Sequence, residues 1–297
     1  VFSIFEYLRG TLLTGFPWNL IAYTWSWSTE LIQILSIIGT YSLSLISITL
    51  FCLPFIFFQN LKNRKNIFFV ICVLIAFIGN YVFGYFNINN SNFNFDKNIN
   101  VKVISPNFSL SDYSSRSESD QLERLIKISD PNKDIKTIFI WPEGIFYESN
   151  LQNLSLYKNL FLNNFSENHL IILGINNFQK SNNSENIKYF NSLAIVNHQL
   201  EILFLYNKVN LVPFGEFLPL ENLLSKLGLK KITQGYSSFS SGNERNLINL
   251  NKNFNKRSIL PLICYEIIYS GKIKLIKQKP DLAINISEDA WFGESSW

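Results

Sequence analysis

The stretch that decides the fold is residues 258–268, which read Ser-Ile-Leu-Pro-Leu-Ile-Cys-Tyr-Glu-Ile-Ile. The apolar run up to Ile263 is typical of a buried strand, and the segment from Tyr265 has the polar-apolar spacing of a helix. Cys264 therefore lies at a predicted sharp turn from strand to helix. A thiol at a helix N-terminus is close to the positive end of the helix dipole, which lowers its pKa. We expect Cys264 to be a nucleophile with a depressed pKa.

Two upstream segments supply the groups that such a nucleophile needs. Residues 138–143 read Ile-Phe-Ile-Trp-Pro-Glu, a buried strand that ends in the carboxylate of Glu143. Residues 201–206 form another apolar segment, and Lys208 follows it. An isolated glutamate at a strand end is usually solvated or ion-paired, and Lys208 is one of 26 basic residues. Their occurrence together with Cys264 favours a base, a cation and a nucleophile of one site.

These residues belong to blocks that resemble a known family. The blocks are Trp141–Glu143, Asn207–Lys208 with 211–220, Ile263–Glu266 and Asp289–Gly293. In this order they are similar to the nitrilase superfamily, and within it to the membrane-bound bacterial apolipoprotein N-acyltransferases. The segment Arg9–Trp18 also resembles part of the membrane region of that family. The resemblance extends over nearly the whole chain.

The resemblance implies roles for six residues. Glu143, Lys208 and Cys264 would be catalytic, and Glu216, Tyr265 and Glu266 would support them. The backbone N–H of Tyr265 would stabilise an oxyanion together with Lys208, and the two supporting glutamates would hold Lys208 and the base in position. The two histidines, His169 and His198, lie in unrelated contexts, so neither a metal site nor a cofactor is expected.

The reaction implied by the resemblance has two steps. Cys264 would take an acyl chain from a membrane phospholipid as a thioester, and the N-terminal amine of a diacylglyceryl-cysteine lipoprotein would then accept it. An alternative is a membrane-tethered carbon–nitrogen hydrolase with the same three residues, in which water replaces the amine. A third interpretation is a non-catalytic membrane protein that keeps the scaffold as a binding surface. The net charge of +4 is too small and too dispersed to indicate a nucleic-acid partner.

The first third of the chain is unusually apolar. Residues 31–61 and 66–95 contain no charged side chain, and about 20 apolar residues suffice to cross a bilayer. We expect membrane helices near 34–58 and 66–86, preceded by an interfacial aromatic loop. The basic loop 60–65 between them predicts a cytoplasmic turn. The catalytic domain would then lie on the periplasmic side of a bacterial inner membrane, in a multi-pass protein.

The composition changes after this region. We expect a membrane part at 1–86, an asparagine-rich linker at 87–97 and an extracytoplasmic domain at 98–297. Alternating apolar and amphipathic segments in the last part predict an α/β layered fold. The expected strands are 100–104, 137–142, 169–175, 190–196, 201–206, 258–263 and 281–286, and the expected helices are 115–129, 151–165 and 267–278. By resemblance the domain is a nitrilase-like α-β-β-α sandwich, truncated at its C-terminus, and the chain is a fragment that lacks both ends of the family's sequence.

The three cysteines are expected to differ in role. Cys52 and Cys72 fall in the predicted membrane helices, where a thiol behaves as a small apolar group. Cys264 is left single in a compartment that favours disulfides, which is better explained by chemistry than by pairing.

The sequence departs from the family pattern at three positions. Gly144 stands where a small hydroxyl residue is more usual, Glu288 stands where asparagine is usual, and an expected tryptophan is absent, with Tyr113 the nearest aromatic residue. These differences bear on how substrates are positioned. The leucine-rich segment Phe214–Leu229 is either a core helix or an arm that enters the membrane interface.

Overall fold

The chain forms two compact units. The computed structural model describes residues 1–12, 15–59, 63–91, 99–180, 187–228, 238–269, 278–288 and 290. Unit 1 comprises Val1–Phe95 with Ile268–Ile273, and unit 2 comprises Asp96–Ile267 with Lys274–Trp297. The boundary near Phe95 lies inside the linker predicted at 87–97, and the assignment of unit 1 to a membrane stays a prediction.

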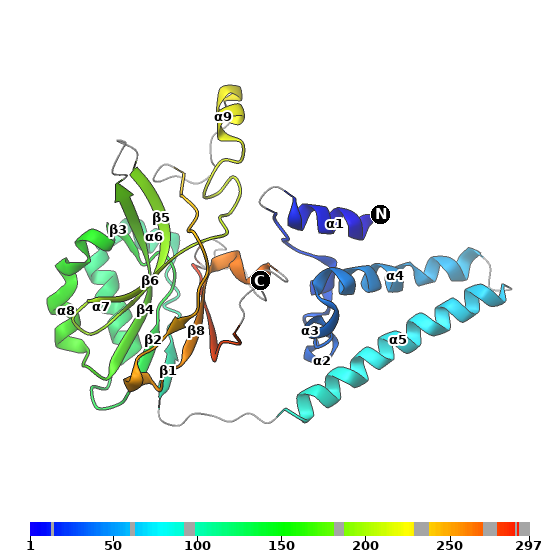
Figure 1. Ribbon diagram of the computed structural model, residues 1–297, viewed down its shortest axis with the longest axis horizontal. Helices are drawn as coiled ribbons and strands as arrows, with labels where there is room; N and C mark the ends of the chain where they lie inside the picture. Colours follow the sequence, from blue (N-terminus) through cyan, green and yellow to red (C-terminus); the bar gives the residue numbers. More distant parts are fainter. Residues whose placement is uncertain are drawn as a thin grey trace. The chain divides into compact units, whose positions relative to one another are not determined.

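Unit 1 is helical (Figure 1). Its elements are α1 (Phe2–Thr11), η1 (Ile21–Trp25), α2 (Thr29–Ile32), α3 (Leu35–Ile38), α4 (Thr40–Gln59) and α5 (Arg64–Asn89). The helix predicted near 34–58 begins only at Thr40, because Gly39 has a φ of 75° and separates α3 from α4. Asn63 caps α5 by accepting a hydrogen bond from the backbone N–H of Lys65.

The two long helices differ in their capacity to cross a bilayer. Among the described residues, α5 is the one helix that is long and apolar enough to do so by length and composition. The apolar stretch of α4 is shorter, Thr40–Phe55, and it contains Pro54. One expected membrane helix is therefore matched in length and composition, and the other is not.

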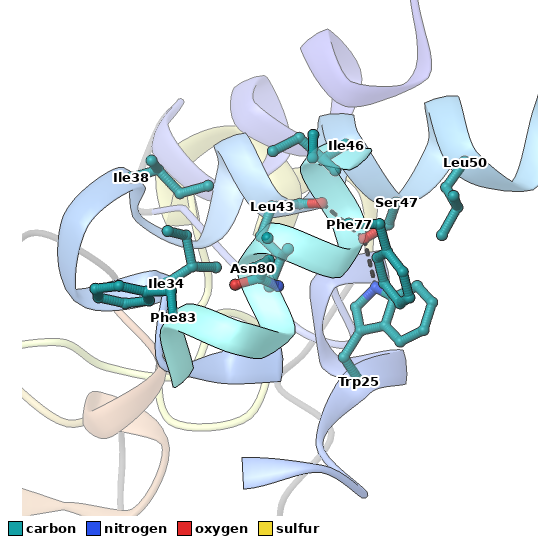
Figure 2. A pocket seen from close by; sticks show the side chains of 12 residues that line it. Trp25, Ile34, Ile38, Leu43, Ile46, Ser47, Leu50, Phe77, Asn80 and Phe83 are labelled. Carbon is teal, nitrogen blue, oxygen red and sulfur yellow. Dashed lines mark hydrogen bonds between the residues drawn. The ribbon is translucent and has the colours of Figure 1, made fainter. Parts of the chain in front are cut away.

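Unit 1 also encloses an apolar cavity of about 340 Å³ between η1, α4 and α5 (Figure 2). Trp25 Nε1 donates a hydrogen bond to Ser47 Oγ at 2.7 Å, and Asn80 Nδ2 donates one to the Leu31 carbonyl at 3.0 Å. Most of the remaining wall consists of aliphatic and phenylalanine side chains. Glu143, Lys208 and Cys264 do not line this cavity, so it is not the predicted reactive site.

Unit 2 is built on two sheets. The larger sheet has the order β1-β2-β4-β5-β6, with β3 also paired to β4, and the smaller has the order β7-β8-β9. The strands are β1 (Asn100–Val103), β2 (Thr137–Ile140), β3 (Phe146–Asn150), β4 (His169–Lys180), β5 (Ile187–Val196), β6 (Ile202–Asn207), β7 (Ile248–Asn249), β8 (Ser258–Ile263) and β9 (Leu282–Ile286). Every predicted strand is present, with its ends shifted by a few residues.

Helices cover one face of the larger sheet. They are α6 (Leu110–Ser115), α7 (Glu118–Ser129), η2 (Leu151–Tyr157) and α8 (Lys158–Asn164), of which α7 and α8 lie together beside the sheet in Figure 1. Leu122 and Leu125 of α7 pack with Phe139 and Trp141 in one hydrophobic cluster. Ser117 caps the N-terminus of α7, so the helix predicted from residue 115 begins three residues later, at Glu118.

The smaller sheet covers the other face. Ile138 and Ile140 of β2 point away from the helices and pack with Ile259 and Ile263 of β8 in a second cluster. This alternation follows from the two-residue period of a strand that is buried on both faces. The described residues thus form helix, sheet and sheet layers, which are three of the four layers of the expected α-β-β-α sandwich.

Only the two ends of the helix predicted at 267–278 fall within the described residues. The chain forms a 3-10 turn, η5, over Cys264–Ile268, and Tyr269 follows it without helical structure. Residues 270–277 lie outside the described part of the chain. Tyr265 and Glu266, inside the turn η5, point into unit 2 and are buried there.

The leucine-rich segment Phe214–Leu229 is not a continuous core helix. It holds a turn and the short helices α9 (Glu221–Leu224) and η3 (Ser225–Leu227). Leu220 is 63% exposed and Phe214 is 44% exposed, whereas Leu218 is buried. The exposed apolar side chains favour the arm over the core helix, although part of the predicted segment lies outside the described residues.

Strand direction explains where the site can form. Strands β2 and β4 are parallel, and β6 runs in the same direction because the pairs β4–β5 and β5–β6 are both antiparallel. The carboxyl ends of β2 and β6 therefore lie at the same edge of the sheet. These ends carry Glu143 and Lys208.

Gly174 sets the distance between β4 and the residue that follows β2. A Cβ at Gly174 would lie 2.6 Å from the Cα of Glu143 and 3.0 Å from the backbone nitrogen of Gly144. We expect Gly174→Ala to lower the free energy of unfolding of unit 2 by about 1–3 kcal/mol, because backbone must move to admit the methyl group. Thermal unfolding of the full-length protein in detergent measures this change.

Gly79→Ala is the matched control. No described atom lies within 4 Å of a Cβ at this position in α5, and alanine favours the helix. Equal unfolding temperatures for the two variants would contradict the role assigned to Gly174.

Candidate active site

Glu143 is positioned by the end of β2. Backbone pairing continues past the strand, since Trp141 N donates to the Ile172 carbonyl at 2.8 Å and Gly174 N donates to the Pro142 carbonyl at 3.2 Å. Gly144 then reverses the chain with a φ of 71°. The Glu143 side chain is 13% exposed, so its carboxylate is held near the surface of unit 2 but is largely shielded from water.

Lys208 follows β6 and is buried, with 1% of its surface exposed. Its Nζ donates to Glu216 Oε1 at 2.9 Å and lies 3.6 Å from Glu143 Oε1. Burial acts to lower the pKa of Lys208, but the charges of Glu143, Glu216 and Cys264 outweigh it and raise the pKa. Lys208 is therefore a fixed ammonium group in a site that contains little water.

Asn191 connects the two carboxylates around Lys208. Its Nδ2 donates to Glu143 Oε1 at 2.6 Å and to Glu216 Oε1 at 2.9 Å. Asn191 lies in the middle of β5 and was not among the residues predicted from the sequence. A polar side chain among the buried residues of β5 was the available signal, because a central strand rarely buries an amide without partners.

Glu216 closes a turn beside Lys208. Its second oxygen accepts from Val212 N at 2.8 Å, and its own backbone N–H donates to the Val212 carbonyl at 2.9 Å. Phe214 inside this turn has a φ of 64°. The carboxylate of Glu216 therefore holds both the ammonium group and the loop after it, which is the supporting position predicted for Glu216.

Cys264 lies at the junction of β8 and η5 and has a φ of 54°. Such a backbone conformation is uncommon for a residue with a side chain and is found at functional turns. Ser287 Oγ lies 3.9 Å from Cys264 Sγ. Glu143 and Lys208 are near enough for their charges to act on the thiol, so the three predicted catalytic residues do come together.

The predicted low pKa of Cys264 is wrong. Burial of the thiol and the negative charge of Glu143 raise its pKa to about 11, and Lys208 and the Ser287 hydroxyl only partly oppose them. Within the described residues, Cys264 begins the short 3-10 turn η5 and not a long helix. Cys264 is therefore mostly a thiol at neutral pH, and a reaction at its sulfur would require a base.

Glu266 links the end of β6, which precedes Lys208, to the end of β8, which precedes Cys264. Its carboxylate is fully buried and accepts hydrogen bonds from the backbone N–H groups of Val209, Asn210 and Ile263 at 2.9–3.0 Å. Val209 follows Lys208, and Ile263 precedes Cys264. One side chain therefore fixes the backbone on both sides of the site.

Arg245 is the counter-charge of Glu266, and no local sequence pattern distinguishes it from the other arginines. Its guanidinium donates to Glu266 Oε1 at 2.6 Å and to Asn210 Oδ1 at 3.1 Å. Tyr206 donates to Glu266 and accepts from Arg245 Nε at 3.0 Å. The buried carboxylate is thus paired and fully hydrogen-bonded, as a buried charge requires.

Tyr265 packs under the ammonium group. Its hydroxyl donates to the Leu211 carbonyl at 2.6 Å, and Lys208 Nζ lies 5.7 Å from the centre of its ring. This contact is within the range of a cation–π interaction. The role predicted for the Tyr265 backbone N–H as an oxyanion donor stays a prediction.

The chain matches known families in two places. Residues 1–53 match the apolipoprotein N-acyltransferase N-terminal domain, and residues 152–297 match the carbon-nitrogen hydrolase family. Apolipoprotein N-acyltransferases from Rhodopseudomonas palustris and Rickettsia prowazekii are 29% and 32% identical to it over 99% of its length. The chain is thus similar to apolipoprotein N-acyltransferases over nearly all of its own length.

The chain spans 56–57% of the length of these two apolipoprotein N-acyltransferases. A solved carbon-nitrogen hydrolase superfamily protein from Xanthomonas campestris aligns with 58% of each chain, at 12% identity and a TM-score of 0.36. An amidase from Nesterenkonia sp. aligns with 51% of each chain, at 12% identity and a TM-score of 0.29. The similarity to apolipoprotein N-acyltransferases rests on the sequence matches, and the nitrilase-like fold rests on the carbon-nitrogen hydrolase match.

The raised pKa of Cys264 gives a testable pH profile. In a background with Cys52→Ser and Cys72→Ser, we expect alkylation of Cys264 by iodoacetamide to accelerate from pH 7 to pH 11. At pH 8 a thiol with a pKa of about 11 is thiolate in about one molecule per thousand. Lys208→Met should move the profile to higher pH, and Glu143→Gln should move it to lower pH because a repelling charge is removed. A midpoint below pH 8.5 would contradict the structure.

Arg245 gives a prediction about stability. Arg245→Met leaves the Glu266 carboxylate buried without its counter-charge, and we expect the free energy of unfolding to fall by about 3–5 kcal/mol. Chemical denaturation of unit 2, followed by tryptophan fluorescence, measures the loss. Arg257→Met is the control, since Arg257 pairs with Asp281 at 3.4 Å with both side chains more than a third exposed, and such pairs contribute at most about 1 kcal/mol. Comparable losses would show that Arg245 is not a buried counter-charge.

Proposed function

We propose that this protein transfers an acyl chain from a membrane phospholipid to the N-terminal amine of a diacylglyceryl-cysteine lipoprotein through a thioester on Cys264. The observation that supports this most is that Cys264 lies near both the Lys208 ammonium and the Glu143 carboxylate. Lys208 Nζ and Glu143 Oε1 are 3.6 Å apart. The chain is also similar to apolipoprotein N-acyltransferases over nearly all of its length. The length and composition of α5 support an enzyme that works beside its lipid substrates.

In the first step, Glu143 takes the proton of the Cys264 thiol while the sulfur attacks the ester carbonyl of the phospholipid. The raised pKa of Cys264 makes this base necessary, because little thiolate is present beforehand. The Lys208 ammonium and the Tyr265 backbone N–H stabilise the oxyanion. The ester C–O bond breaks, and Glu143 returns the proton to the leaving lysophospholipid oxygen.

In the second step, the lipoprotein amine attacks the thioester carbonyl. A nitrogen–carbon bond forms, the carbon–sulfur bond breaks, and Glu143 takes a proton from the nitrogen. An amine is a better nucleophile than water toward a thioester, so transfer can exceed hydrolysis once an acceptor is bound. The two substrates react in turn, and the kinetics should be ping-pong.

The enzyme would lie in the bacterial inner membrane as a multi-pass protein, with unit 2 on the periplasmic side. Arg64 and Lys65 at the start of α5 support a cytoplasmic position for that end of the helix. Unit 2 follows the opposite end of α5 in the chain, so it would lie across the membrane, where lipoproteins are found.

The carbon-nitrogen hydrolase match over residues 152–297 supports a second candidate function. Here the same Glu143, Lys208 and Cys264 would cleave a small amide, with water as the acceptor. The two functions differ in the acyl acceptor and therefore in the product that leaves Cys264.

The proposed function predicts an acyl-enzyme. When the full-length protein is incubated with phospholipid vesicles, intact-protein mass spectrometry should show one acyl adduct, and peptide mapping should place it on Cys264. A diacylated lipopeptide should remove the adduct and gain the acyl chain. Cys264→Ala should give no adduct, whereas Cys52→Ala with Cys72→Ala should keep it.

An adduct of equal amount on the Cys264→Ala variant would reject the thioester. Rapid release of ammonia from small amides, without transfer to the lipopeptide, would favour the hydrolase instead.

A further inference from the structure

Ser287 is a polar neighbour of Cys264 that takes no part in the steps proposed above. Strands β8 and β9 are parallel, and their register pairs Ile263 with Ile286. The next residues of the two strands are Cys264 and Ser287, so they leave the smaller sheet side by side at its carboxyl edge. Ser287 Oγ donates a hydrogen bond to Cys264 Sγ at 3.9 Å. The register of two paired strands therefore sets this contact.

The Ser287 hydroxyl is directed to this sulfur alone. Within the described residues, Ser287 Oγ has no other hydrogen-bond partner. The contact is long, because a thiol sulfur is a weak acceptor. Hydrogen bonds of this kind often shorten only when charge develops during the reaction. The resting structure thus holds a donor in place for a sulfur that has yet to become charged.

The charges around the sulfur make a neutral donor useful. Lys208 Nζ lies between two carboxylates, 3.6 Å from Glu143 Oε1 and 2.9 Å from Glu216 Oε1. These three groups together carry one net negative charge, which does not favour a second negative charge on the sulfur. Burial and Glu143 raise the pKa of Cys264, whereas Lys208 and the Ser287 hydrogen bond act to lower it. A hydroxyl can stabilise the sulfur anion without a counter-charge of its own.

We propose that the Ser287 hydroxyl is a catalytic hydrogen-bond donor that stabilises negative charge on the Cys264 sulfur, both when the thiol is deprotonated and when the thiolate leaves the thioester. This inference rests on the acyl transfer proposed above. Thiol and thioester sulfurs are weak acceptors, whereas a thiolate is a strong one. The hydrogen bond is therefore strongest in the charged states between the stable ones, which is the condition for lowering a barrier.

Ser287 keeps its proton throughout, so the balance of each step is unchanged. In the first half-reaction, Glu143 takes the thiol proton while the sulfur bonds to the ester carbonyl carbon, and the hydroxyl donates to the charge that develops on the sulfur. In the second, the carbon–sulfur bond breaks and its electron pair returns to the sulfur. The hydroxyl stabilises this thiolate until Glu143 gives a proton back to it.

The test compares two serines at opposite ends of the same strand pair. Ser287→Ala removes the donor at the carboxyl edge of the smaller sheet, and Ser287→Thr keeps a hydroxyl there. Ser258→Ala is the matched control, because Ser258 Oγ donates to Asp281 Oδ2 at 2.8 Å at the amino edge. All variants are made in the full-length protein with Cys52→Ser and Cys72→Ser.

Alkylation of Cys264 reports on the sulfur anion without any acyl substrate. At pH 8, loss of a hydrogen bond to a charged group should reduce the thiolate population about tenfold. A thiolate of higher pKa is intrinsically more nucleophilic, which offsets part of this loss. We therefore expect the iodoacetamide rate to fall about threefold in Ser287→Ala, to recover in Ser287→Thr and to stay unchanged in Ser258→Ala.

The two half-reactions should also slow. Mass spectrometry follows the formation of acyl-Cys264 with phospholipid vesicles and, in a single turnover, its decay with a diacylated lipopeptide. In Ser287→Ala we expect both rate constants to fall about tenfold. The half-saturating lipopeptide concentration should stay within about twofold, because the hydrogen bond is made to the sulfur and not to the acceptor. Ser287→Thr should recover most of both rates.

Each outcome decides the matter. Wild-type rates of acyl transfer in Ser287→Ala would overturn the inference, whether or not alkylation slows. An equal loss in Ser287→Thr would also overturn it, because the hydroxyl would not be the group that matters, and so would an equal loss in Ser258→Ala, which indicates general damage to the strand pair. If the wild-type protein forms no acyl-enzyme, the proposed function fails, whereas the alkylation rates still decide whether Ser287 stabilises the sulfur anion.

Discussion

The arrangement of the site depends on a single buried carboxylate, that of Glu266. Its oxygens accept hydrogen bonds from backbone N–H groups in the segment after Lys208 and in the strand before Cys264. They also accept hydrogen bonds from the side chains of Tyr206 and Arg245. These contacts join the two sheets where the larger sheet ends beside Lys208 and the smaller sheet ends beside Cys264. Burying a carboxylate in this position costs free energy unless every oxygen is satisfied, and Arg245 supplies the charge that makes the burial favourable. The layers of unit 2 provide the two strands, but the Glu266 contacts fix how their ends face each other.

The local pattern of the sequence was enough to locate the strands and the predicted reactive residues. Apolar runs such as 138–141 are buried on both faces, and they are recognisable because β-branched and aromatic residues dominate them. The families matched by residues 1–53 and 152–297 agree with the resemblance read from short blocks around Glu143, Lys208 and Cys264. Their catalytic roles remain proposals, but their proximity in unit 2 was foreseen.

Features that depend on contacts between distant residues could not be read from the sequence. Asn191 and Arg245 have no distinctive local pattern, and their importance comes from partners 21 to 48 residues away. The pKa of Cys264 was misjudged for a related reason. Local sequence suggested a helix dipole, but the pKa is set by burial and by Glu143, which lies on another sheet.

The charge around Cys264 has a further consequence for the time course of the reaction. The carboxylates of Glu143 and Glu216 surround the Lys208 ammonium. A protonated thiol and a thioester at Cys264 are both neutral, so the site has the same total charge in either state. A free thiolate would add a negative charge to a buried position that already has a net negative charge. In the proposed reaction, the acylated state would therefore carry no electrostatic penalty relative to the resting state. An enzyme of this kind would stay acylated until an acceptor arrives, so its turnover would follow the supply of acceptors and not the rate at which lipid is captured.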